Sequence, residues 1–271
     1  MAPASLPNSM SMEVVVWGGG TGGVAAALQA ARSGVDTLLL TPGSWLGGML
    51  SSAGVCAPDG HELSCWQTGL WGAFLRDIAK RELSGLDQNW VSCFGFQPAT
   101  AEQLLRDWVG RERHLQWLPC CELISVTRKE DRIDQLRVGC AEQQHLIRAS
   151  VVIDGSDLGD LMALAEVPHR WGWEPKEQWN EPSAPNRERL STDLFFRDHP
   201  VQSPTWVSFG QLDESSADLH AVAKPSDPFQ GCLSDFGLAR TLSYGRLPGG
   251  LVMLNWPLHG NDWHDGLHRA I

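Results

Sequence analysis

The stretch Glu13–Gly23, EVVVWGGGTGG, decides the fold of this chain. Val14 to Trp17 form a short apolar run of the kind that becomes a buried parallel strand. Three glycines follow at the spacing G-x-G-x-x-G: Gly18, Gly20 and Gly23. Residues 24–31 are small and mostly apolar, which predicts a helix that Gly34 ends, and residues 35–40 supply a second apolar strand. The sequence therefore predicts a strand–turn–helix–strand unit.

Each of these glycines has a physical role in such a unit. Gly18 permits the tight turn, and Gly20, which has no Cβ, lets a pyrophosphate approach the backbone. Gly23 lets the helix pack closely on the sheet, and the free N–H groups at the helix start hold an anion. The alternative is an ordinary glycine turn before a buried helix. The strand, helix and second strand stand in the expected order, which favours a dinucleotide-binding site.

Composition limits the possible functions. The 271 residues carry a net charge of -11, which makes a nucleic-acid partner improbable. No apolar run approaches the ~20 residues of a membrane span, so no membrane association is expected. The N-terminal segment MAPASLPNSMSM lacks the pattern of a secretory signal. The length suffices for one large core or two modest domains.

The seven cysteines predict a reduced, cytoplasmic protein, because their number is odd and no C-x-x-C occurs. Cys56 and Cys65 are separated by eight residues, which is wider than the tight pair of a redox-active disulfide.

The rest of the chain adds further elements. Thr41 ends the second strand, where dinucleotide sites usually carry an acidic residue that binds a ribose, and a threonine hydroxyl can still donate a hydrogen bond there. Thr100 is the expected N-cap of a helix to Val109, with Gln103 completing a capping box. The other predictions are a helix over 66–83, a β-meander over 115–148 with a charged tip at 129–131, a strand over 149–153, a glycine-containing turn over 154–160 and a helix over 161–165.

This order resembles the FAD-dependent oxidoreductases of the glutathione-reductase-like superfamily. The segments that carry the resemblance are VVVWGGGTGGVAAALQAARSG, LLLTPGSWLGGML, GFQPATAEQLL, VVIDGSDLGDLMALA and LPGGLVMLNWPLHGND. The resemblance implies an α/β fold: a Rossmann-like FAD-binding domain with a parallel sheet and a β-meander, plus part of an inserted α+β substrate domain. It places the FAD-binding domain at residues 12–168 and the partial substrate domain at residues 169–271.

The resemblance also implies the residues that would bind FAD. The pyrophosphate would face the first glycine turn, the double glycine with Met49, and the turn that follows residue 153. The adenosine ribose would face Thr41 with Pro42, and a backbone group near Leu123 would meet the adenine. The full set is Gly18, Gly20, Thr21, Gly22, Gly23, Thr41, Pro42, Gly47, Gly48, Met49, Leu123, Asp154, Gly155 and Ser156.

The candidate catalytic residues lie near the C-terminus. The resemblance places the segment with His259 and Asn261 towards the flavin and substrate, where His259 could move a proton. A structural histidine in a turn is the alternative. His264 and His268 are spaced like two metal ligands on one helix face, but a solvated terminal segment is the preferred interpretation, so we predict no metal site.

The resemblance further implies a C-terminal return to the FAD-binding domain, for which residues 260–271 are too short, so we expect a truncated homologue with exposed apolar surface. The predicted function is hydride or electron transfer between FAD and an unidentified small-molecule substrate, with the oligomeric state open. The alternatives are a non-catalytic nucleotide-binding module and an NAD(P)-dependent dehydrogenase. The meander that leads to a second glycine turn favours FAD over NAD(P).

Overall fold

The computed structural model describes residues 7–201, 204–211 and 230–256. These form two compact units, described separately below. The first holds residues 7–167, 209–211 and 242–253, and the second holds residues 168–201, 204–208, 230–241 and 254–256. The division of the chain into a FAD-binding and a substrate domain at residue 168 stays a prediction.

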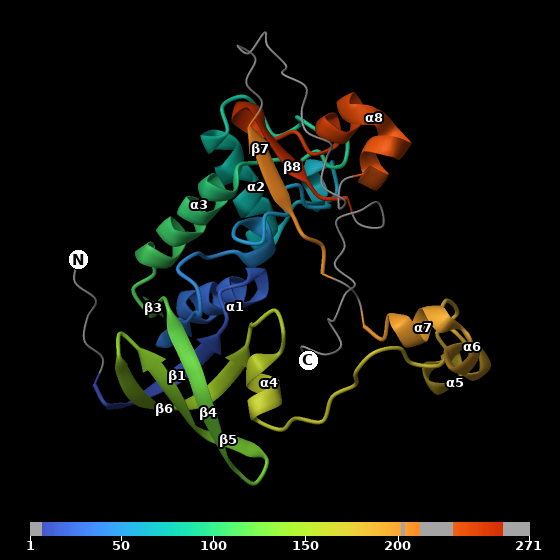
Figure 1. The fold of residues 1–271 in the computed structure, drawn as a ribbon. Coiled ribbons are helices and arrows are strands. Elements are labelled where there is room, and N and C mark those ends of the chain that lie inside the picture. The colour runs from blue at the N-terminus through green and yellow to red at the C-terminus, as the bar shows by residue number, and fades with distance from the viewer. Residues whose placement is uncertain (1–6, 202–203, 212–229, 257–271) are drawn as a thin grey trace. The chain divides into compact units, whose positions relative to one another are not determined.

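A six-stranded sheet in the order β3-β2-β1-β6-β5-β4 forms the centre of the first unit (Figure 1). Strands β3, β2, β1 and β6 pair in parallel, whereas β6, β5 and β4 pair antiparallel as a meander. The strands are β1 (Ser9–Trp17), β2 (Thr37–Leu40), β3 (Leu115–Leu118), β4 (Cys121–Lys129), β5 (Arg132–Cys140) and β6 (Gln143–Asp154). This is the predicted α/β, Rossmann-like arrangement.

Helices and short turns complete the first unit. Among them, α3 packs against both α1 and α2, and α1 lies against β1 and β2. They are α1 (Thr21–Arg32), η1 (Gly48–Leu50), η2 (Ser64–Trp66), α2 (Gly69–Arg81), α3 (Pro98–Arg111), α4 (Asp160–Leu164) and η4 (Pro248–Gly250). Two further strands, β7 (Ser208–Gln211) and β8 (Leu251–Leu254), pair with each other. Ser208 and Leu254 belong to the second unit, and the other residues of these two strands belong to the first.

Strand alternation explains the layers of the first unit. Successive side chains point to opposite faces of a strand, so β1 and β2 each bury two sets of residues. One set packs on the meander in a core cluster formed by Val15, Trp17, Leu38, Leu40, Cys121, Leu136, Val138, Ile147 and Leu161. The other set, Val14, Val16 and Leu39, is equally buried on the side of α1. Burial on both faces is why these strands read as continuous apolar runs.

Most of the predicted elements are confirmed, with corrections at their ends. Gly34 ends α1 with a φ of 82°, as expected for a residue at this position. Helix α3 begins at Pro98 with Gln97 as its N-cap, so the predicted Thr100 capping box is wrong. A proline suits the first helical position because an N–H there would have no partner, and the N-cap lies three residues earlier than predicted.

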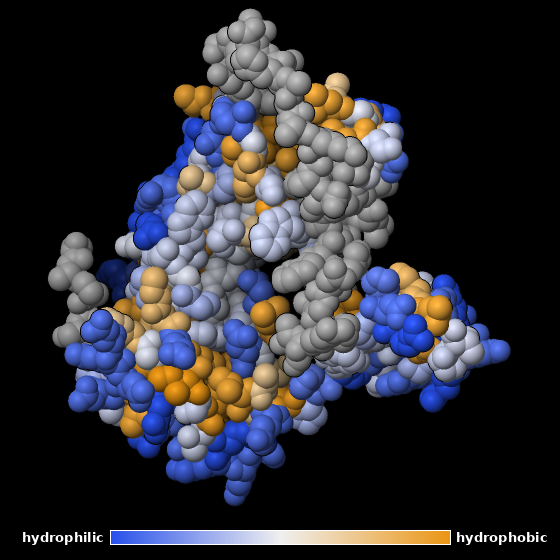
Figure 2. All heavy atoms as spheres, in the orientation of Figure 1, coloured by the Kyte–Doolittle hydropathy of each residue, from blue (hydrophilic) through white to orange (hydrophobic). Residues whose placement is uncertain are grey.

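The meander also differs from the prediction. Residues 115–118 form β3, which pairs in parallel with β2 and does not belong to the meander. The predicted strand over 149–153 is the second half of the long strand β6. The hairpin tip between β4 and β5 lies at Glu130 and Asp131, as predicted. Figure 2 shows hydrophilic residues around this hairpin and a hydrophobic area over the strands above it.

The cysteines require a correction. Cys121 at the start of β4 and Cys140 at the end of β5 face each other across the hairpin and form a disulfide. The expectation that the cysteines are reduced is therefore wrong for this pair. The described free cysteines are Cys56, Cys65, Cys93 and Cys120.

One edge of β6 has an exposed apolar segment. β5 pairs with β6 only as far as Ile147, whereas β1 continues to Asp154 on the other side. Within the described residues, no strand pairs with the second half of β6 on that side, and Val151 is 51% exposed.

The second unit contains short helices around an aromatic cluster. Trp173 and Phe195 contact Phe196, which is buried, and the guanidinium of Arg189 lies 5.2 Å from the Phe196 ring centroid. Residues 194–196 belong to α7, which Asp193 caps by accepting a hydrogen bond from the Phe195 N–H. The helices are α5 (Lys176–Trp179), α6 (Arg187–Thr192), α7 (Leu194–Asp198) and α8 (Gln230–Tyr244), which continues into the first unit.

Candidate functional site

Three turns converge where the parallel strands β1, β2 and β6 end. β1 and β6 end side by side, with Trp17 opposite Asp154, and β2 ends at Leu40 beside Trp17. Since parallel strands end at one edge of a sheet, the loops that follow them share that edge, which is where α/β proteins bind ligands. The three turns here are residues 18–20, 41–48 and 155–157, and we call them the glycine turns.

Main-chain contacts hold the first and third glycine turns together. The Gly155 N–H donates to the Trp17 carbonyl at 2.7 Å. A Cβ on Gly18 would lie 2.3 Å from the carbonyl carbon of Gly155, and a Cβ on Gly155 would lie 2.4 Å from the Cα of Gly23. No side chain fits at these three positions without moving the backbone. The glycines therefore permit the close approach of two strand ends and a helix.

The second glycine turn lies against the first. The Gly47 N–H donates to the Gly19 carbonyl at 2.8 Å, and the Thr21 hydroxyl donates to the Gly47 carbonyl at 2.9 Å. A Cβ on Gly48 would lie 2.9 Å from the Cα of Gly20. Gly47 and Gly48 have φ values of 112° and 51°, which favour glycine. The structure thus brings Gly20, Gly48 and Gly155 together, as the sequence predicted.

The first turn of α1 opens towards this meeting point. Its N-cap is Gly20, which has no side chain to accept a hydrogen bond from the N–H groups of the first turn. A Cβ on Gly22 would meet nothing within 4 Å. A helix start without a side-chain cap suits an anion such as a pyrophosphate. The backbone of this site therefore fits a dinucleotide.

The Thr41 side chain is not open to a ligand. It is fully buried, its hydroxyl donates to the Gly43 carbonyl at 2.7 Å, and it accepts a hydrogen bond from the Trp117 indole at 3.1 Å. The hydroxyl thus closes the turn after β2, and this geometry does not support a ribose contact through it. Pro42, the next residue, is exposed.

Leu123 and Met49 occupy different surroundings. The meander reaches the end of β2, because the Cys121 N–H donates to the Thr41 carbonyl at 2.9 Å, and Leu123 follows two residues later as a half-buried residue beside the core cluster. Met49 lies in η1 and is 54% exposed. Both residues lie near glycine-turn segments, and their roles stay predictions.

Asp154 and Ser156 organise the third glycine turn. One oxygen of Asp154 accepts hydrogen bonds from the Ser156 N–H and hydroxyl, and the other accepts from the Met162 N–H at 2.8 Å. The Ser156 hydroxyl accepts from the Asp160 N–H at 2.9 Å. These two side chains fix the path from β6 into α4, which leaves Gly155 to meet the other turns.

Sequence reasoning missed Asp157, the next residue in this turn. A Cβ on Gly20 would lie 2.7 Å from the Oδ1 of Asp157, and one on Gly48 would lie 3.7 Å from the same oxygen. The only signal in the sequence is that Asp157 follows Gly155 by two positions. A carboxylate therefore stands at the point where the three turns meet.

The catalytic residues predicted from the sequence are not among the described residues. His259 and Asn261 lie outside the described residues, and so do His264 and His268. Cys56 is buried, and burial raises the pKa of its thiol to about 12, so it remains protonated and unreactive at neutral pH.

In the described ranges no cluster of metal-binding side chains occurs. None of the helices in the same ranges has the length and apolar character to cross a bilayer.

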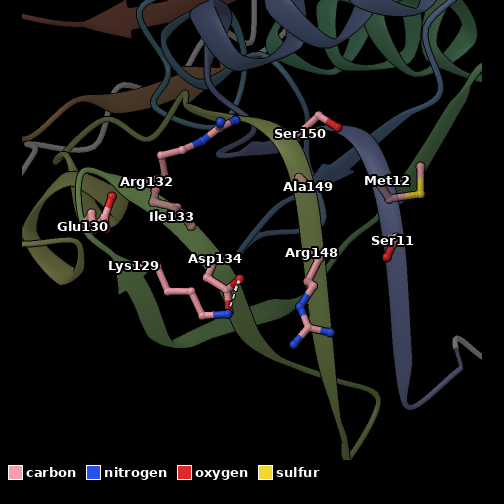
Figure 3. Close-up of a pocket in the computed structure, with 10 residues that line it drawn as sticks. All are labelled: Ser11, Met12, Lys129, Glu130, Arg132, Ile133, Asp134, Arg148, Ala149 and Ser150. Atoms are coloured by element: carbon pink, nitrogen blue, oxygen red, sulfur yellow. Dashed lines mark ion pairs between the residues drawn. The ribbon is translucent and has the colours of Figure 1, made fainter.

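A hollow in the described part of the chain lies away from the glycine turns. It has a volume of about 820 Å³ and lies between the start of β1, the middle of β6 and the β4–β5 hairpin (Figure 3). Lys129 and Asp134 form an ion pair of 3.2 Å on its wall, and Arg148 extends from β6. Ser11 and Met12 mark this as the amino end of β1, so the hollow is separate from the glycine turns.

Several solved structures are similar to part of this chain. The halogenase CndH, a myxobacterial protein, is 16% identical with a TM-score of 0.39, over 54% of this chain and 37% of that one. The p-nitrophenol 4-monooxygenase PnpA from Pseudomonas putida is 14% identical with a TM-score of 0.42, over 60% and 45%. The flavin-dependent monooxygenase PieE, in complex with FAD and substrate, is 19% identical with a TM-score of 0.43, over 60% and 33%.

The chain thus spans less than half the length of these structures. A search of curated proteins finds no match. A family profile described as FAD dependent oxidoreductase matches residues 13–270, which is nearly the whole chain. This chain therefore belongs to the family of FAD-dependent oxidoreductases.

Proposed function

We propose that this chain binds FAD at the glycine turns and takes part in hydride or electron transfer between FAD and a small-molecule substrate. The observation that carries the proposal is the convergence of Gly20, Gly48 and Gly155 in front of the uncapped start of α1. Bare main chain at three turns lets a diphosphate lie against the backbone, and the helix start favours its negative charge. When bound, FAD supplies the redox chemistry, and the protein supplies placement.

In this proposal the residues of the chain divide the work. The N–H groups at the start of α1 hold the pyrophosphate, and Gly47 and Gly48 form the opposite wall. Asp154 and Ser156 hold the third turn in place through the hydrogen bonds described above. His259 and Asn261, which lie outside the described residues, remain the proposed catalytic pair.

FAD binding is tested by reconstituting the purified protein and following flavin fluorescence and the absorption spectrum. Gly20→Val is the blocking variant, because the added side chain enters the space between the glycine turns, called the cradle below, where the pyrophosphate would lie. Gly20 has a φ of -66°, which any residue adopts. We expect the variant to keep its fold and to bind FAD about tenfold more weakly or worse. Gly110→Ala in α3 is the control, because a Cβ there meets nothing within 4 Å. A folded wild-type protein that binds no flavin would contradict the proposal.

A non-catalytic nucleotide-binding module is the second candidate. It is favoured by one observation: the polar side chains of Asp154 and Ser156 at the glycine turns are engaged in hydrogen bonds that hold the third turn. The two candidates differ in what happens after FAD binds. Flavin that is bound but that no organic donor, including NADH and NADPH, reduces under anaerobic conditions favours the module. Reduction by a donor favours the oxidoreductase.

A further inference from the structure

The carboxylate of Asp157 stands in the cradle proposed for the pyrophosphate. Its Oδ1 is 2.7 Å from the position of a Cβ on Gly20 and 3.7 Å from that of a Cβ on Gly48. Those two glycines lack side chains at the place where main chain faces a ligand. The space that the glycines leave is thus reached by a side chain from the third turn, and that side chain ends in a carboxylate.

Asp157 differs from the two acidic residues beside it. Asp154 accepts hydrogen bonds from Ser156 and Met162, and Asp160 accepts one from the Trp17 indole at 3.3 Å. Asp157 is exposed, and it has no hydrogen-bond or ion-pair partner within the described residues. Its neighbours therefore have structural roles that explain their presence, whereas no contact explains Asp157.

The positive end of α1 provides the reason for a carboxylate at this position. The helix is 12 residues long, and its first turn has no side-chain cap and no acidic residue of its own. Negative charge near a helix start is stabilising, so Asp157 supplies what the first turn lacks. A diphosphate brings negative charge to the same N–H groups. Two like charges cannot share that place without a large loss of affinity.

We propose that Asp157 acts as an internal anion that competes with the pyrophosphate of FAD for the start of α1 and so sets the affinity of the site. This inference rests on the proposed function, because it concerns the same glycine turns. Binding of the dinucleotide requires the carboxylate to swing out of the cradle. The start of α1 then exchanges the Asp157 carboxylate for the pyrophosphate of FAD. Only the difference between these two interaction free energies contributes to the affinity for FAD.

Asp157→Asn and Asp157→Gly test the proposal through the dissociation constant of FAD, measured by titration of flavin fluorescence. We expect both variants to bind FAD about tenfold more tightly than the wild type, because each removes the competing charge. Asp131→Asn at the hairpin tip removes the same charge away from the glycine turns and should leave the dissociation constant unchanged. Equal affinity in the wild type and both Asp157 variants would overturn the proposal.

A second measurement separates this inference from the proposed function. Inorganic pyrophosphate at millimolar concentration should raise the melting temperature of Asp157→Asn more than that of the wild type, because it needs only the start of α1. If no variant binds FAD but pyrophosphate still stabilises Asp157→Asn selectively, the proposed function fails and the competing carboxylate stands. If FAD binds equally to all variants and pyrophosphate shows no preference, the proposed function stands and the inference fails.

Discussion

The two ends of the parallel sheet are built in different ways. At the carboxyl ends of the strands, main chain meets main chain, and Gly18, Gly23 and Gly155 leave no room for a Cβ. At the amino ends, the hollow of about 820 Å³ is lined by long charged side chains. At the carboxyl ends, the close contacts require that these glycines have no Cβ. At the amino ends, the lining consists of side chains that can move. Substitutions should therefore have large effects at the carboxyl ends and small effects at the amino ends.

The largest effect is expected for Gly23→Ala. A Cβ on Gly23 would lie 2.1 Å from the carbonyl oxygen of Gly18, which belongs to the backbone and cannot move aside. We expect a loss of about 3 kcal/mol or more in the free energy of unfolding, since overpacking against main chain forces the helix from the sheet. Urea denaturation followed by tryptophan fluorescence measures this change.

Gly22→Ala is the matched control for that variant. It makes the same substitution one residue earlier in α1, where a Cβ would meet nothing within 4 Å. Alanine is the better helix former by about 1 kcal/mol, so the control should be neutral or slightly stabilising. Equal losses in the two variants would show that close packing is not the reason for Gly23.

The disulfide should give the next largest effect. Cys121 and Cys140 are 19 residues apart, and their link closes the β4–β5 hairpin at the end where β4 meets Thr41. In the chain-entropy account, a loop of this size restricts the unfolded chain by about 3 kcal/mol. Cys140→Ser should therefore lower the free energy of unfolding by about 2–3 kcal/mol. Thiol titration of the denatured, unreduced wild type should find two thiols fewer than its seven cysteines; seven free thiols would contradict the link.

Thr41→Val should have an intermediate effect on stability and almost none on binding. The variant keeps the shape of the side chain but leaves the Trp117 indole N–H without its acceptor in a buried place. We expect a loss of about 1–3 kcal/mol in the free energy of unfolding. The dissociation constant of FAD should change less than about twofold, whereas a ribose contact through this hydroxyl would weaken FAD by tenfold or so. Thr41→Ser, which keeps the hydroxyl, is the control.

The parts of this structure that the sequence predicts are those that depend on neighbours in the chain. The strand Val14–Trp17, the glycine spacing and the end of α1 at Gly34 all follow from local pattern, and so does the charged tip at Glu130 and Asp131. The parallel pairing of β3 with β2 does not, because a short apolar run reads the same in a meander and in a parallel sheet.

Long-range register explains the other differences. Cys121 and Cys140 become neighbours only when β4 and β5 pair in the observed register, and seven cysteines contain many possible pairs. The buried hydroxyl of Thr41 depends on Trp117, which lies 76 residues further along the chain. Asp157 reads as one more polar residue in a turn until the three glycine turns are assembled around it.

The smallest effect is expected at the amino end, for the Lys129–Asp134 pair. These side chains are 72% and 23% exposed, and they close the same hairpin that the disulfide closes at its other end. An ion pair in water gains little, because solvent screens the charges and both side chains lose freedom. Lys129→Gln, Asp134→Asn and the double variant should give a coupling energy below about 0.5 kcal/mol in a double-mutant cycle. FAD affinity should not change in any of them, because the hollow that they line is separate from the glycine turns. A change in FAD affinity comparable to that of Gly20→Val would contradict the placement of the dinucleotide site at the carboxyl ends of the strands and would favour the hollow.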